Sequence, residues 1–226
     1  MMNKTTLGIL GLGSRTTAYY ITELNRLYNQ TKGGFSSCPF ILLNTDFDAI
    51  NSLLPNPSED LDNVTQLCIN EVEKLNTDCI LVPNITLHET IDNLVLDKHI
   101  IHPLLLTTSK IKENNWTKIV LFASLHSMES SYISSYFKSN GIETILPSEG
   151  DRFLIDDVRK RVYAGTETEE LIKSYHLLIE KYAAKHPVVL GCTELSILKP
   201  INNQNLVDMA EVQITEAVQR VLQNIP

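Results

Sequence analysis

The stretch Val188-Val189-Leu190-Gly191-Cys192-Thr193-Glu194 decides the fold. Its apolar residues form a continuous run rather than an alternating one, which is typical of a parallel strand buried on both faces. The run stops at Gly191, so Cys192 is expected at the mouth of the strand. The stretch therefore predicts an α/β fold, and its thiol is the best candidate for chemistry in the sequence.

An earlier segment has the same form. Cys79-Ile80-Leu81-Val82 is a continuous apolar run, and Pro83-Asn84-Ile85-Thr86-Leu87-His88 leads from it into a threonine turn. The place that matches Cys192 is held there by Asn84, which has no thiol. The two segments predict that the chain contains two related halves.

Apolar runs alternate with helical patterns from end to end. The strands expected from these runs are residues 7–10, 40–43, 79–82, 118–122, 143–146 and 188–190. The helices expected between and after them are residues 15–29, 59–75, a segment ending near 138, a long region 151–184 interrupted near Gly165, and 206–222. The order βαβαβ, repeated, predicts mainly parallel sheets covered by helices.

The fold class predicted is α/β, with two pseudo-symmetric Rossmann-like or flavodoxin-like halves and a cleft between them. The first half is expected over residues 1–102 and can also take the C-terminal helix 205–226, and the second half over residues 103–204. Ligands of open α/β sheets bind beyond the carboxyl ends of the strands. The expected site residues are those of four such loops: Ser14, Asn84 to Thr86, Ser127, and Cys192 with Thr193.

Composition and net charge limit the kinds of partner that this protein is expected to bind. The chain has 226 residues, a net charge of −8 and a sequence pI near 5.2, which argues against a broad nucleic-acid surface. Its short basic cluster, Arg159-Lys160-Arg161, lies among aspartates and is interpreted as a solvated helix face. No apolar run approaches the ~20 residues that cross a bilayer. Without an apolar secretory signal near Met1, a cytoplasmic location is expected.

The cysteines do not predict a metal site. Cys38, Cys68, Cys79 and Cys192 show neither C-x-x-C spacing nor a nearby histidine pair, so no zinc site is expected. In a reducing compartment they should be free thiols. The first three are assigned to packing, which leaves Cys192 for chemistry.

These motifs, taken in order, resemble the aspartate/glutamate racemase superfamily over nearly the whole chain. The resemblance rests on Val189 to Leu195, on Val82 to His88 compared with the family's Pro-Cys-Asn-Thr-Ala-His, and on Gly33-Gly34. The run His102-Pro103-Leu104-Leu105 and a C-terminal helix beginning near Asn205 add to it. It implies two pseudo-symmetric α/β domains, a cysteine from each on opposite faces of an amino-acid substrate, no cofactor such as pyridoxal phosphate, and a homodimer.

The family's chemistry requires an acid and a base at the α-carbon. Cys192 suits either role, because a helix N-terminus or nearby donors can lower a thiol pKa. The resemblance assigns Ser14, Thr86, Ser127 and Thr193 to the substrate's α-carboxylate. It therefore implies an amino-acid racemase-like isomerase that acts on Asp, Glu or a related carboxylate.

The sequence departs from the family at the first half-site. Asn84 stands where the first catalytic cysteine is expected, and an amide is neither an acid nor a base near neutral pH. Basic residues that bind a side-chain carboxylate have no match in Leu43-Asn44-Thr45-Asp46, and Tyr163 occupies the approximate place of a lysine. Supporting roles are open for His88 at the Asn84 loop, for His126 beside Ser127, and for Glu194 as a cap or anchor of the Cys192 loop.

Three alternatives remain at this point. A single-thiol decarboxylase needs only one cysteine to protonate an enediolate, which the pair Asn84 and Cys192 allows. A degenerate member would bind a small carboxylate without turnover. Gly11-Leu12-Gly13-Ser14-Arg15-Thr16 is a broken dinucleotide fingerprint and gives a weak indication of a nicotinamide enzyme.

Overall fold

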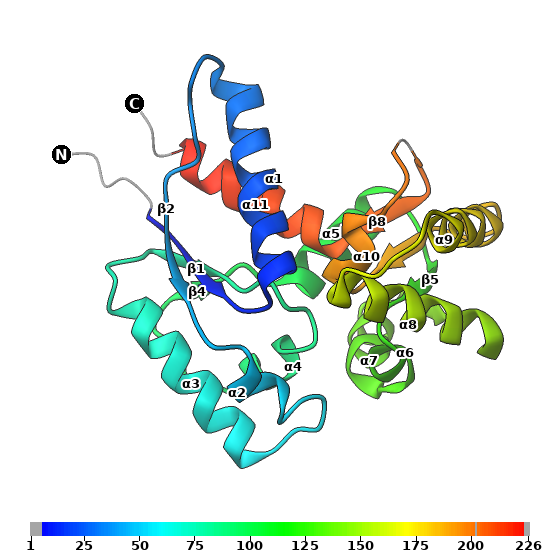
Figure 1. Cartoon of the computed structure of the whole chain (residues 1–226), viewed down its shortest axis with the longest axis horizontal. Coiled ribbons are helices and arrows are strands. Elements are labelled where there is room, and N and C mark those ends of the chain that lie inside the picture. Colours follow the sequence, from blue (N-terminus) through cyan, green and yellow to red (C-terminus); the bar gives the residue numbers. More distant parts are fainter. Residues whose placement is uncertain (1–5, 202, 224–226) are drawn as a thin grey trace. The chain divides into compact units, whose positions relative to one another are not determined.

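The computed structural model describes residues 6–201 and 203–223 (Figure 1). The first five residues of the predicted first half and residues 224–226 of the predicted C-terminal segment lie outside this description. The chain forms two compact units. One consists of the chain up to His102 together with the segment from Gln213 onward, and the other runs from Pro103 to Val212.

The first unit contains a parallel sheet of order β2-β1-β3-β4. Its strands are β1 (Leu7–Gly11), β2 (Phe40–Asn44), β3 (Cys79–Leu81) and β4 (His99–Ile100). The helices connecting them are α1 (Ser14–Lys32), α2 (Asp48–Asn51), α3 (Glu59–Glu73) and α4 (His88–Ile91). The central strands β1 and β3 are buried along their whole lengths, as their continuous apolar runs predict.

The second unit repeats this topology with the sheet order β6-β5-β7-β8, again parallel. Its strands are β5 (Lys118–Phe122), β6 (Glu143–Ile145), β7 (Val188–Leu190) and β8 (Leu206–Asp208). Its helices are α5 (Pro103–Glu113), α6 (Leu125–Glu129), α7 (Ser131–Ser139), α8 (Glu149–Ala164), α9 (Glu169–Ala183) and α10 (Thr193–Ile197). The last described helix is α11 (Met209–Gln223). The predicted α/β class with two related halves is confirmed.

The predicted start of the last helix is wrong. Residues Leu206–Asp208 form strand β8, which pairs in parallel with Val188–Leu190, and the helix begins at Met209. The apolar residues of this segment fit the buried stripe of a helix. In the folded chain, however, the backbone of residues 206–208 pairs with the backbone of β7. Asp208 then marks the change of structure, because its Oδ1 accepts a hydrogen bond from Ala210 N at 2.9 Å.

Gly191 brings the end of β7 close to β5. Its backbone N–H donates to Phe122 O at 2.8 Å. A Cβ atom at this position would lie 3.2 Å from a Leu121 side-chain carbon and 3.3 Å from Ala123 Cβ, tighter than ordinary van der Waals contact. The glycine thus fits the narrow space between two strand ends and sets the backbone position of Cys192. Within the described ranges, no helix combines the length and apolar character needed to cross a membrane.

Candidate functional site

Cys192 follows the end of β7, as predicted, with Gly191 between them, and it is the N-cap residue of α10 with an extended backbone (φ −149°, ψ 128°). Its thiol is partly buried and donates a hydrogen bond to Glu194 Oε2, with 2.8 Å between sulfur and oxygen. Glu194 lies in the first turn of the same short helix. Its carboxylate binds the candidate thiol itself, a contact beyond its expected role as a cap or loop anchor.

The pKa of the Cys192 thiol is raised well above its ordinary value. Burial is the main cause, and the negative charge and hydrogen bond of Glu194 add to it. Arg159 and the backbone N–H of Glu194 act in the opposite direction. A helix N-terminus can lower a thiol pKa, but the one-turn helix α10 does not outweigh burial and the adjacent carboxylate. The thiol is protonated at neutral pH.

The loop after β5 carries two further predicted residues, and β5 is the direct neighbour of β7 in the sheet. Ser127 is buried at the start of α6. Its hydroxyl accepts a hydrogen bond from Ser124 Oγ at 2.8 Å, and its backbone N–H donates to the same Ser124 Oγ at 3.1 Å. His126 precedes it on the same helix.

Two polar atoms of these loops are buried without a hydrogen-bond partner among the described residues. They are Thr193 Oγ1, on a side chain that is only 3% exposed, and His126 Nε2. A buried polar atom without a partner carries a free-energy cost that a bound ligand can remove. These two atoms are therefore candidates for contact with a ligand.

Arg159 and Asp156, on α8, belong to this region although the sequence suggested a solvated helix face. Asp156 is buried, and its Oδ1 accepts hydrogen bonds from Arg159 Nε at 2.9 Å and from Leu125 N at 3.1 Å. Its Oδ2 pairs with Lys160 at 2.7 Å. The i,i+3 spacing of Asp156 and Arg159 was visible in the sequence, but the packing of α8 against α10 was not.

The helix that carries Thr193 and Glu194 is anchored by buried polar groups. Tyr175 OH donates to Leu195 O at 3.1 Å, and Ser196 Oγ donates to Asp208 Oδ1 at 2.7 Å. Lys199 Nζ lies 2.8 Å from Asp208 Oδ2. These contacts tie α10 to α9 and β8 and hold the Cys192 turn in place.

In the first unit, Asn84 follows β3 in the loop that leads to α4. Its Oδ1 accepts a hydrogen bond from Leu87 N at 3.0 Å, so the side chain caps the turn. His88 is fully buried, and its Nδ1 donates to Asn84 O at 2.8 Å. Burial, aided by neighbouring His102, lowers the pKa of His88 to about 3. The neutral imidazole of His88 thus holds the backbone of the Asn84 loop.

The other predicted residues of this unit lie on the same loop and on the next strand. Thr86 is half-buried between Asn84 and His88. Ser14 is the exposed first residue of α1, after β1, and β1 pairs with β3. The structure thus places Asn84, Thr86 and His88 on one loop, with Ser14 at the end of the adjacent strand.

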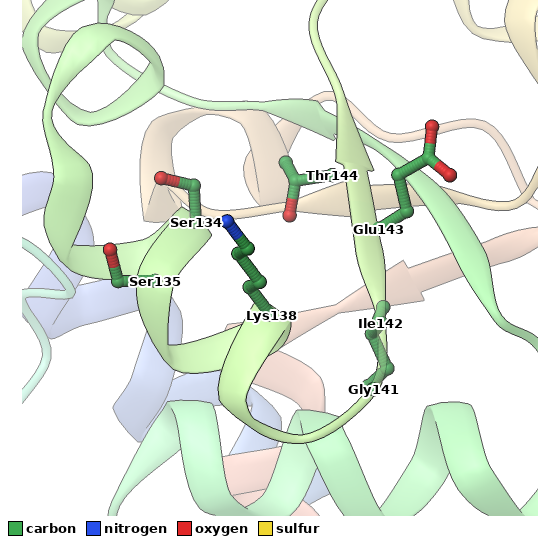
Figure 2. A pocket seen from close by; sticks show the side chains of 7 residues that line it. All are labelled: Ser134, Ser135, Lys138, Gly141, Ile142, Glu143 and Thr144. Atoms are coloured by element: carbon green, nitrogen blue, oxygen red, sulfur yellow. The ribbon is translucent and has the colours of Figure 1, made fainter.

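A separate surface pocket lies at the edge of the second unit's sheet (Figure 2). Side chains of α7 and β6 line it, together with the turn between them: Ser134, Ser135, Lys138, Gly141, Ile142, Glu143 and Thr144. None of the predicted site residues is among them. Across residues 6–201 and 203–223, no group of three or more His, Cys, Asp or Glu side chains is arranged to hold a metal ion.

Comparison with known proteins agrees with this fold. Residues 9–222 match the Asp/Glu/hydantoin racemase family. A candidate Asp/Glu racemase from Yersinia pestis has a similar structure, with a TM-score of 0.82 and 23% identity over 97% of this chain and 100% of that one. An aspartate racemase homologue from Pyrococcus horikoshii gives a TM-score of 0.80 and 17% identity over 96% of this chain and 99% of that one. Picrophilus torridus aspartate racemase gives a TM-score of 0.77 and 17% identity over 97% of this chain and 94% of that one. The family match extends over nearly the whole sequence, and the chain belongs to the Asp/Glu/hydantoin racemase family.

Proposed function

We propose that this protein is a cofactor-independent, racemase-like isomerase that acts at the α-carbon of an amino acid such as Asp, Glu or a related carboxylate. Cys192 is its acid/base residue. The observation that carries the proposal is the hydrogen bond from the Cys192 thiol to Glu194 Oε2, at a strand end of a racemase-family fold. A thiol paired with a carboxylate can both release and regain a proton.

The proposed cycle begins with a protonated thiol. The proton passes from Cys192 Sγ to Glu194 Oε2, which leaves a thiolate and a carboxylic acid with no change in total charge. The thiolate then removes the α-proton of the substrate, and the resulting thiol returns a proton to the carbanion. Thr193 and Ser127 are assigned to the α-carboxylate from the second unit, and Ser14 and Thr86 from the first, because a carbanion next to a carboxylate needs hydrogen-bond donors.

Asn84 is proposed to occupy the place of the family's first cysteine. It follows the third strand of its sheet as Cys192 follows the corresponding strand of the other, and both sheets have the same strand order. Because a carboxamide does not exchange a proton near neutral pH, we expect one-sided turnover. Exchange of the α-proton with solvent should be faster than inversion of the stereocentre.

The test is proton NMR of a panel of amino acids in deuterated buffer, which follows the loss of the α-proton signal. Cys192→Ser should abolish exchange. Cys68→Ser, a partly buried thiol on α3, is the matched control and should exchange as the parent protein does. Equal rates for Cys192→Ser and the parent would refute the acid/base role.

The same samples separate the alternatives. Binding of an amino acid, measured by calorimetry, with no α-proton exchange in any panel member would indicate a carboxylate-binding protein without turnover. Release of carbon dioxide from a substituted malonate, dependent on Cys192, would indicate a decarboxylase. The homodimer that the family implies is also a proposal, and light scattering coupled to size-exclusion chromatography measures it directly.

A further inference from the structure

In the second unit, Arg159 interacts electrostatically with both Cys192 and Glu194. Helix α8 packs against α10, the helix that carries Glu194. Arg159 projects from α8 with a side chain that is only 26% exposed. Its Nε is hydrogen-bonded to the buried carboxylate of Asp156 at 2.9 Å, so the guanidinium is held by its inner nitrogen.

Asp156 is itself fixed from three sides. Besides its hydrogen bond from Arg159, Asp156 accepts a hydrogen bond from the backbone N–H of Leu125, at the start of α6. It also forms an ion pair with Lys160. Its side chain is 5% exposed. A carboxylate with three donors at this depth has little freedom to move, and it joins the loop after β5 to helix α8. The Arg159 anchor is therefore part of the framework of the second half-site.

We propose that Arg159 is a positioning residue for the Cys192–Glu194 pair: its guanidinium, held by Asp156, is the fixed positive charge that favours the thiolate once Glu194 has taken the thiol proton. The inference rests on the proposed acid/base role of Cys192. In the proton transfer, the S–H bond breaks and an O–H bond forms on Glu194 Oε2. The negative charge moves from the carboxylate to the sulfur, and Arg159 interacts more strongly with Cys192 than with Glu194.

The electrostatics of the neighbouring elements support this role. Among the described residues, the charged or titratable groups that interact with Cys192 or with α10 and its C-cap include Glu194 on the helix itself, Arg159 on α8, Tyr175 and His176 on α9, and Asp208 at the end of β8. Tyr175 is buried with its pKa raised well above the ordinary value, so it is neutral. Asp208 is paired with Lys199. Arg159 is the group among these that lowers the pKa of the Cys192 thiol.

The test measures the acidity of the thiol without relying on turnover. The rate at which iodoacetamide alkylates Cys192 is followed by mass spectrometry of its peptide between pH 7 and pH 10, since only the thiolate reacts. Arg159→Gln should slow alkylation at a fixed pH, by about tenfold for each unit that the pKa rises. Arg159→Lys, which keeps the charge, should remain within about twofold of the parent, because a lysine charge there acts over a similar distance.

The matched control is Arg161→Gln on the same helix. Arg161 is about half exposed and pairs with the exposed Asp157, so its loss should not change alkylation of Cys192. If Arg159→Gln lowers the melting temperature enough to compromise folding, Arg159→Met is used in its place, because methionine retains the apolar part of the side chain without the charge. An unchanged alkylation profile in the charge-removing variant overturns the proposal. So does an equal loss in Arg159→Lys, because shape rather than charge would then be responsible.

Failure of this inference is distinguishable from failure of the proposed function. If Cys192→Ser still exchanges α-protons, the acid/base role fails, whatever the alkylation profile of the Arg159 variants. If Cys192→Ser abolishes exchange but Arg159→Gln alkylates as the parent does, the role of Cys192 stands and that of Arg159 fails. Slower alkylation in Arg159→Gln together with slower exchange supports both.

Discussion

The Cys192 thiol donates a hydrogen bond to Glu194 Oε2 at 2.8 Å, between residues two positions apart at the start of α10. In this arrangement the carboxylate stabilises the protonated thiol, and burial acts in the same direction. Cys192 therefore differs from cysteines that are activated by a stable thiolate. Its basic form requires that the proton move to Glu194.

Replacing Glu194 should separate thiol acidity from catalysis. Glu194→Gln removes the negative charge that raises the Cys192 pKa, so alkylation of Cys192 near pH 8 should become faster. The same change removes the proton acceptor, so α-proton exchange should fall by about 10²-fold or more. Alkylation kinetics and NMR exchange are measured on the same protein. Glu169→Gln, at an exposed position in the first turn of α9, should change neither, and faster exchange in Glu194→Gln would contradict the proposed transfer.

Restoring a thiol in the first unit should increase stereoinversion. Asn84→Cys adds a group that can exchange a proton at the position proposed to match the family's first cysteine. We expect inversion, followed by chiral chromatography, to rise relative to α-proton exchange. Asn84→Ser, which loses the carboxamide without adding a thiol, is the control. No gain in inversion by Asn84→Cys would refute the correspondence between the two loops.

His88 should make stability depend on pH. Its folded-state pKa is about 3 and that of an unfolded histidine is near 6.5, so the unfolded chain binds the proton more tightly between these values. The free energy of unfolding should therefore be unaffected by His88 above about pH 6.5. It should decrease as pH falls below that, by up to about 1.4 kcal/mol per pH unit.

Urea denaturation at a series of pH values measures this effect. His88→Asn should have a flatter pH profile between about pH 4 and pH 6.5, even if it is less stable throughout because the contact with Asn84 O changes. His186→Asn, at a partly exposed position after α9, should keep the parent profile. A parent-like slope in His88→Asn would show that another group is responsible.

Asp208 should stabilise the second unit strongly. Its carboxylate is buried and binds Ser196, Lys199 and the backbone N–H of Ala210. Asp208→Ala should lower the free energy of unfolding by about 3 kcal/mol, because Lys199 and Ser196 lose a buried partner. Glu211→Ala removes a mostly exposed partner of the same lysine and should cost less than about 1 kcal/mol. Similar losses in urea melts would contradict this account.

Much of the fold could be read from continuous apolar runs. Strands 118–122 and 188–190 were predicted with the bounds that the structure shows. A parallel strand that is buried on both faces has a continuous apolar run, and the ends of the run mark the ends of the strand. Strand β8 could not be predicted in the same way. Its three residues continue the apolar stripe of the following helix, and only pairing with β7 makes them a strand.

The candidate site was predicted in part. Cys192, Thr193 and Glu194 are adjacent in the sequence, so identifying the end of the strand also located all three of them. Arg159 was assigned to a solvated face because its sequence neighbours are charged. Which side of a helix meets another helix depends on long-range packing, and α8 packs on α10 although Arg159 and Cys192 are 33 positions apart in the chain.

The sequence by itself determined the two α/β halves and the position of a thiol at a strand end, because hydrophobic periodicity and turn residues act locally. The tertiary structure decided the protonation of that thiol. Burial and the carboxylate of Glu194 raise its pKa, and Arg159 lowers it. Electrostatic interactions depend on distance through space and on removal from water, and neither is fixed by position along the chain.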